Sequence, residues 1–94
     1  MQLERKDIES SLGRKGFRLF ETHHRFYYLY VDGKKTGIYT YVSTAPKYKT
    51  LQAKLIGDMA RELKLSKAEF ADLIECKMSY DAYVARLRDQ GVQV

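Results

Sequence analysis

The 94-residue sequence has one cysteine, one proline and no tryptophan. A single cysteine, Cys76, excludes an internal disulfide and gives no metal-ligand spacing, so we expect it to be a small buried apolar group. No stretch approaches the roughly 20 apolar residues that a membrane-spanning helix needs. Residues 1–6 lack the apolar run of a secretory signal. We therefore expect a soluble cytoplasmic protein with no membrane partner.

Several signatures of enzyme chemistry are also absent. The sequence contains no paired carboxylates, no glycine-rich phosphate loop, no nucleophile elbow and no zinc-ligand pattern. We therefore expect no metal, dinucleotide or other cofactor. No repeat and no low-complexity linker divides the chain, which favours a single compact domain.

Basic side chains are in excess. Seventeen Lys and Arg residues against twelve Asp and Glu residues give a formal net charge of +5. A positive surface favours polyanions such as nucleic acids, because binding releases their condensed counterions. The same charge would suit an acidic protein partner. The charge alone does not decide between these partners.

Periodicity and capping signals predict four helices, at residues 5–15, 51–63, 67–75 and 80–89. Gly16 is placed to end the first helix in a left-handed conformation. Ser66 and Glu69 have capping-box spacing at the start of the third, and Ser79 precedes the fourth. Residues 43–50, which include the only proline, are predicted to form a loop.

Aromatic and β-branched composition predicts three strands, at residues 17–21, 25–31 and 34–42. Asp32-Gly33 is a strong signal for a two-residue hairpin turn. Such a turn would pair Val31 with Lys34, Leu29 with Thr36, Tyr27 with Ile38, Arg25 with Thr40 and His24 with Tyr41. Because side chains alternate between faces, the more aliphatic face should meet the helices. This face carries Tyr27, Leu29, Val31, Ile38 and Val42.

The opposite face of this hairpin is mostly aromatic. It carries His24, Phe26, Tyr28, Tyr30, Lys35, Tyr39 and Tyr41. Tyrosine has a flat apolar body and a polar tip, on which nucleic-acid bases stack and which protein partners also use. Tyr28, Tyr39 and Tyr41 are therefore candidate RNA-binding residues. Alternatively, these tyrosines are strand formers packed under the C-terminal helices.

The only histidines, His23 and His24, are the candidates for proton transfer. The unperturbed imidazole pKa lies near physiological pH, as metal-independent ribonuclease chemistry requires. A base removes the 2′-hydroxyl proton, an acid protonates the leaving 5′-oxygen, and cations stabilise the phosphorane. Neighbouring strand residues face opposite ways, so at most one of the two acts; a merely structural or exposed role is the alternative. Candidate phosphate ligands are Lys34, Lys35, Lys47 and Lys49.

Four short motifs follow one another along the chain. They are Lys6-Asp7-Ile8-Glu9 leading to Lys15-Gly16-Phe17, then His24-Arg25-Phe26-Tyr27-Tyr28, then Val31-Asp32-Gly33-Lys34-Lys35-Thr36, and finally Arg61-Glu62-Leu63-Lys64-Leu65-Ser66. In this order they resemble the HicA/YcfA-like toxin family. The resemblance covers residues 5–66 best, and the remainder is similar to a longer branch with two extra helices. It divides the chain into a core, residues 1–66, and a C-terminal helical extension, residues 67–94.

The resemblance implies a double-stranded-RNA-binding-like α-β-β-β-α core with a three-stranded antiparallel sheet and two appended helices. It also implies an mRNA-cleaving toxin of a type II toxin–antitoxin system, neutralised by a HicB-like antitoxin. The family's active histidine lies on the second strand, where His24 matches best and His23 is the alternative. Two departures stand out. Glu21-Thr22-His23-His24 replaces the usual Gly-Ser-His, and Val42-Ser43-Thr44-Ala45 occupies the place of Val-Ser-His-Gly.

Two other functions stay open. A non-catalytic RNA-binding module with the same fold would show salt-sensitive RNA binding without cleavage. A protein-interaction module would use the tyrosine-rich sheet face, and it would dimerise or co-purify with a partner while lacking affinity for RNA.

Overall fold

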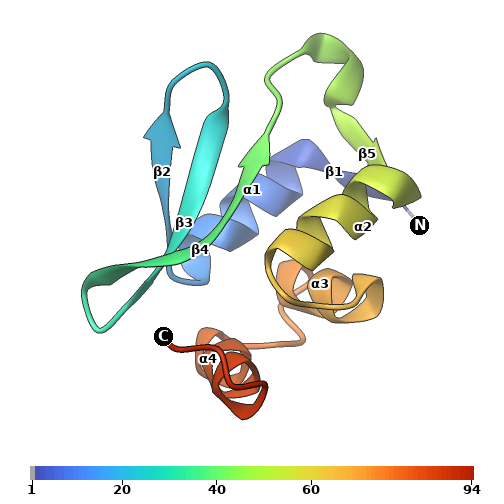
Figure 1. Ribbon diagram of the computed structural model, residues 1–94. Coiled ribbons are helices and arrows are strands. Elements are labelled where there is room, and N and C mark those ends of the chain that lie inside the picture. The colour runs from blue at the N-terminus through green and yellow to red at the C-terminus, as the bar shows by residue number, and fades with distance from the viewer. Residues whose placement is uncertain (1) are drawn as a thin grey trace.

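The computed structural model describes residues 2–94 and has an α+β architecture (Figure 1). Its elements, in chain order, are β1 (Gln2–Glu4), α1 (Arg5–Arg14), β2 (Phe17–Glu21), β3 (Arg25–Val31), β4 (Lys34–Val42), the 3-10 turn η1 (Pro46–Tyr48), β5 (Thr50–Gln52), α2 (Ala53–Glu62), α3 (Lys67–Ile74) and α4 (Tyr80–Asp89). The predicted class, an antiparallel three-stranded sheet with four helices, is confirmed. No helix within residues 2–94 has the length and apolar character needed to span a membrane.

The three-stranded sheet has the order β2-β3-β4. Asp32 and Gly33 both have positive φ, at 54° and 76°, and Val31 pairs with Lys34. The two-residue turn is therefore confirmed, because a type I′-like geometry needs positive φ at both central residues. Gly16 is also left-handed, with φ at 84°, and it separates α1 from β2 as predicted.

Beyond Tyr30–Lys35, however, the predicted register of the β3–β4 hairpin is wrong. The observed pairs are Tyr28–Tyr39, Tyr27–Thr40, Phe26–Tyr41 and Arg25–Val42, in place of Tyr27–Ile38, Arg25–Thr40 and His24–Tyr41. Leu29, predicted to pair with Thr36, lies at the point where the register shifts. The Thr36 hydroxyl donates to the Leu29 carbonyl oxygen (2.8 Å) and accepts from the Ile38 amide (3.1 Å), which holds a bulge in β4. The register shifts by two residues, and an even shift leaves the side chains beyond the bulge on their predicted faces.

The face predicted to meet the helices forms part of one hydrophobic core. Its members Tyr27, Leu29, Val31, Ile38 and Val42 are all buried. They share that core with residues of all four helices, among them Ile8 and Leu12 of α1, Ile56 and Met59 of α2, Phe70 and Leu73 of α3, and Tyr83 and Leu87 of α4. All the helices therefore contribute to the core beneath this one side of the sheet (Figure 1).

The C-terminal helices begin at the predicted caps. Ser66 forms a complete capping box with Glu69, and the Ser79 hydroxyl accepts from the Ala82 amide. Tyr83 stacks on Phe17 with ring centroids 6.0 Å apart and donates to the Leu63 carbonyl oxygen at 2.8 Å. The core is thus continuous across residue 66, the boundary that the resemblance implies between the core and the C-terminal extension.

Two local predictions are wrong. The second helix begins at Ala53 and not at Leu51, because residues 50–52 pair with residues 2–4 as a two-stranded sheet. Cys76 is exposed and not buried, because it lies in the turn between α3 and α4, where it has a positive φ.

The loop between β4 and β5 is held by Arg5. Its guanidinium donates to the Ser43 and Ala45 carbonyl oxygens.

Candidate functional site: an open aromatic sheet face ending at His24

One face of the three-stranded sheet is left open by the helices. We call it the open aromatic face, and it consists of Arg18, Phe20, His24, Phe26, Tyr28, Tyr30, Lys35, Tyr39 and Tyr41. Tyr39 and Tyr41 are 42% and 44% exposed, so the C-terminal helices do not cover them. The alternative that these two tyrosines pack under the helices is therefore wrong.

On this face an unbroken row of ring contacts joins, in order, Phe20, Tyr28, Tyr39, Phe26, Tyr41 and His24. Tyr28 stacks on Tyr39 with centroids 5.0 Å apart and an interplanar angle of 24°. Phe26 contacts Tyr41 at 5.7 Å, and Phe20 meets Tyr28 edge-on at 5.4 Å. Each such pair contributes roughly 0.5–1.5 kcal/mol beyond its area burial, so the row is a rigid apolar platform.

Two cations lie over rings of this face. Lys35 Nζ is 4.1 Å from the centroid of Tyr28 and 4.8 Å from that of Phe20. Arg18 Cζ is 4.1 Å from the centroid of Tyr30. Cation–π attraction keeps positive charge over the rings. Arg18 and Phe20 were not predicted as residues of this face, although continuing the alternation across the β2–β3 hairpin places both on it.

His24 lies at one end of the row, in the turn just before β3 rather than within a strand. The Thr22 amide donates to the His24 carbonyl oxygen at 3.0 Å and closes that turn. The imidazole is 5.1 Å from the Tyr41 ring and 6.4 Å from that of Phe26, centroid to centroid. Its Nδ1 is shielded from solvent and has no hydrogen-bond partner within residues 2–94. His23 is exposed.

The residue after His24 is anchored to α1. The Arg25 guanidinium donates to both Glu9 carboxylate oxygens at 3.0 Å, and the Tyr27 hydroxyl donates to Glu9 Oε1 at 2.7 Å. Burial and this hydrogen bond to Glu9 raise the pKa of Tyr27, so its hydroxyl stays protonated as a donor. These contacts fix the backbone on which His24 is carried.

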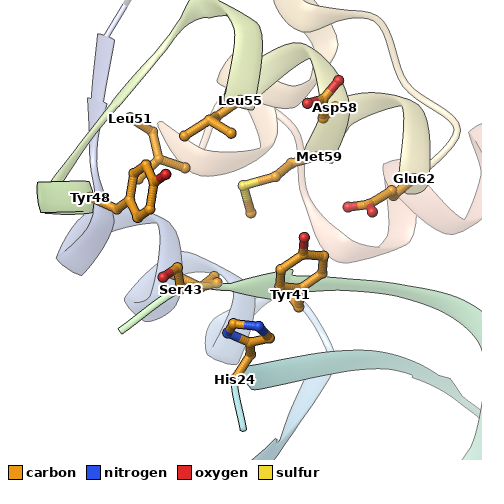
Figure 2. A pocket seen from close by; sticks show the side chains of 10 residues that line it. His24, Tyr41, Ser43, Tyr48, Leu51, Leu55, Asp58, Met59 and Glu62 are labelled. Carbon is orange, nitrogen blue, oxygen red and sulfur yellow. The ribbon is translucent and has the colours of Figure 1, made fainter. Parts of the chain in front are cut away.

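A groove of about 240 Å³ adjoins His24, between the end of β4 and α2 (Figure 2). It is lined by His24, Tyr41, Val42, Ser43, Tyr48, Leu51, Leu55, Asp58, Met59 and Glu62. Figure 2 shows His24 and Tyr41 on one side and Leu55, Asp58, Met59 and Glu62 across from them on α2. This groove was not predicted from the sequence, because its walls come from segments far apart in the chain.

The four candidate lysines do not converge. Lys35 lies on the open aromatic face, whereas Lys34 is exposed at the hairpin tip. Lys47 and Lys49 are exposed beyond the other end of β4, on either side of the groove residue Tyr48. Lys47 Nζ is 5.1 Å from the centroid of the Tyr48 ring. In the part of the chain that the structure describes, no three His, Cys, Asp or Glu side chains are grouped so as to hold a metal ion.

Comparisons with known proteins give no match: no family model, no curated protein and no solved structure corresponds to this chain. The resemblance to the HicA/YcfA-like family rests on the four sequence motifs and stays a prediction.

Proposed function

We propose that the chain binds single-stranded segments of RNA on the open aromatic face and cleaves them without a metal ion, with His24 transferring protons. The observation that carries this proposal is the unbroken row of exposed and half-buried rings, which has two cations on the same face and ends at a histidine. Neither a structural core nor a simple solvated surface requires this combination.

Binding follows from the chemistry of the platform. Bases stack on aromatic side chains irrespective of sequence, at roughly 1–3 kcal/mol per base. Arg18 and Lys35 are exposed and have long, flexible side chains. Their charged groups can therefore turn from the rings to phosphate oxygens. The resulting affinity should fall with salt, with a log–log slope of about −0.7 for each phosphate contacted on a single strand.

Cleavage follows from the position of His24. Its imidazole takes the proton of a 2′-hydroxyl as that oxygen attacks the neighbouring phosphorus. The bond to the 5′-oxygen breaks, and this oxygen gains a proton from the imidazolium or from water. The products are a 2′,3′-cyclic phosphate and a free 5′-hydroxyl, with no co-reactant consumed.

The proposal also includes membership of the HicA/YcfA-like toxin family and an antitoxin as the protein partner. α1, β2, β3, β4 and α2 follow the α-β-β-β-α order of a double-stranded-RNA-binding-like fold, and both helices contribute to the core under one face of the sheet. We take mRNA as the substrate and a HicB-like antitoxin as the protein that neutralises the chain. Such an antitoxin would act most simply by covering the open aromatic face.

The test is cleavage of a structured RNA in EDTA by the wild type, His24→Gln and His23→Gln. We expect fragments with cyclic-phosphate ends from the wild type and from His23→Gln, and a loss of about 100-fold or more in rate for His24→Gln. Equal cleavage by His24→Gln would contradict the role of His24. Intact RNA with all three proteins would contradict cleavage altogether.

One observation favours a second candidate function, a non-catalytic RNA-binding module. Proton-transferring histidines are usually oriented by a hydrogen bond to the other ring nitrogen, whereas Nδ1 of His24 has no partner within residues 2–94. This candidate predicts salt-sensitive binding of RNA that stays intact, with little effect of His24→Gln.

A further inference from the structure

The groove beside His24 is lined by both aliphatic and aromatic side chains. Leu51 and Met59 are buried and Leu55 is half-buried, and all three line the groove. Tyr41 and Tyr48 add aromatic surface, and Figure 2 shows the Tyr41 side chain pointing toward α2. A volume of about 240 Å³ is enough for a flat heterocycle the size of a purine base.

Two carboxylates stand at the α2 side of this groove. The Thr40 hydroxyl, which is fully buried, donates to Glu62 Oε1 at 2.7 Å and fixes that side chain. Glu62 Oε2 accepts no hydrogen bond from any residue between 2 and 94. Asp58 accepts from the exposed Arg61 guanidinium at 3.3 Å. Carboxylates repel phosphate and accept hydrogen bonds from N–H groups. The α2 side of the groove therefore favours a ligand that has hydrogen-bond donors.

From this arrangement we infer that the groove holds one unpaired RNA base next to His24, and that it prefers guanine. Guanine presents N1–H and N2–H₂ side by side, and one carboxylate accepts from both. Adenine and cytosine offer a single amino group, and the N3–H of uracil lies between two carbonyl acceptors. Proteins that read flipped bases use the same combination of stacking and hydrogen bonds to the Watson–Crick edge.

The inference deepens the proposed function and rests on it. A base in the groove brings its sugar and phosphate to the rim, where His24 lies and where Lys47 flanks Tyr48. Neighbouring bases would continue onto Tyr41 and the open aromatic face. The expected consequence is that cleavage occurs next to guanine in single-stranded RNA.

The experiment compares three hexanucleotides of 2′-O-methyl RNA, which lack the attacking 2′-hydroxyl and stay intact. One is all uridine, one carries a single guanosine, and one carries inosine in its place, which removes only the N2 amino group. Their affinities are measured for the wild type, Glu62→Gln and the control Glu75→Gln. The control makes the same charge change at an exposed carboxylate whose one ion-pair contact is with Lys77 at 3.9 Å.

We expect the wild type and Glu75→Gln to bind the guanosine hexamer about tenfold more tightly than the inosine hexamer, since inosine lacks one of the two donors of the bidentate pair. Glu62→Gln should bind the two equally. A glutamine side chain can still accept the hydrogen bond from Thr40, so we expect the Glu62→Gln variant to fold. If its thermal unfolding temperature shifts, Asp58→Asn serves as the second variant. We expect Asp58→Asn to lose less of the preference for the guanosine hexamer.

Equal affinity of the wild type for all three hexamers would overturn the guanine groove and leave the proposed function standing. Failure to bind any RNA would overturn both. A protein partner that Glu62→Gln releases, while RNA binding is unchanged, would place a protein side chain in the groove and would also overturn the inference.

Discussion

At the scale of single residues, the most strongly perturbed carboxylate is structural. Glu69 completes the capping box with Ser66, and the Arg86 guanidinium donates to both of its carboxylate oxygens. Hydrogen bonds from Arg86, and then from the Ser66 amide, lower the pKa of Glu69 to about 2. The pair joins the start of α3 to α4.

This shift predicts how stability depends on pH. A glutamate in the unfolded chain has a pKa of about 4.3, so the contribution of Glu69 is complete above that pH and is lost as the pH falls toward 2. We expect Glu69→Gln to unfold more easily at pH 7 and to lose less stability between about pH 4.5 and 2 than the wild type. Urea unfolding at several pH values measures both.

The control for this prediction is Glu75→Gln, whose carboxylate is exposed. Its stability curve should stay parallel to that of the wild type. A parallel curve for Glu69→Gln would show that the ion pair with Arg86 contributes nothing to stability.

At the scale of elements, the sequence predicted those features that depend on neighbouring residues. The capping box at Ser66, the cap at Ser79 and the Asp32-Gly33 turn are set by local chemistry, and all three are present. The bulge in β4 was not predictable in this way, because it depends on a hydrogen bond from Thr36 across the hairpin to Leu29.

Removing that hydrogen bond tests the origin of the bulge. We expect Thr36→Val to lower the free energy of unfolding by about 1–2 kcal/mol, since the Ile38 amide loses its acceptor and the Leu29 carbonyl its donor. Urea unfolding measures the change. The matched control is Thr44→Val at an exposed loop residue, which should change stability by less than about 0.5 kcal/mol. Equal effects of the two substitutions would contradict the assigned role of Thr36.

The candidate site was also predictable only in part: the strand residues were predicted, and the groove was not. Alternation along β3 and β4 placed Tyr28, Tyr39 and Tyr41 on one face, and the even register shift preserved that result. The groove was not predictable, because Tyr48, Met59 and Glu62 converge only when η1 and α2 pack beside β4. Strands of three residues, such as the one containing Leu51, carry too little pattern to be separated from the helix that follows.

At the scale of the whole molecule, residues 67–94 belong to the same core as the sheet. Phe70, Leu73 and Tyr83 are fully buried against residues of the first two-thirds of the chain. Ser11 donates to the Ile74 carbonyl oxygen, and the Lys15 ammonium donates to that of Met78 at 2.7 Å. The C-terminal helices therefore complete the fold beneath the sheet and leave its other face free.

This continuity predicts that residues 1–66 alone do not fold cooperatively. Deleting residues 67–94 exposes the large apolar surface that Phe70, Leu73 and Tyr83 cover in the full chain. A chain this short buries only a modest fraction of its surface on folding, so the loss of this burial is severe. We expect the truncated chain to lack a sigmoidal urea transition by circular dichroism, under conditions in which the full chain shows one. A cooperative transition for residues 1–66 would establish the α-β-β-β-α part as an independent domain.

The proposed function places RNA on the open aromatic face and next to His24. The most direct measurement is a nuclear magnetic resonance titration of the full chain with an uncleavable 2′-O-methyl RNA, following backbone and aromatic ring signals. If the proposed function is right, we expect the largest changes at the rings of Tyr28, Tyr39 and Tyr41 and at His24, with α3 and α4 unaffected. Changes confined to the helices, or none at saturating RNA, would contradict it.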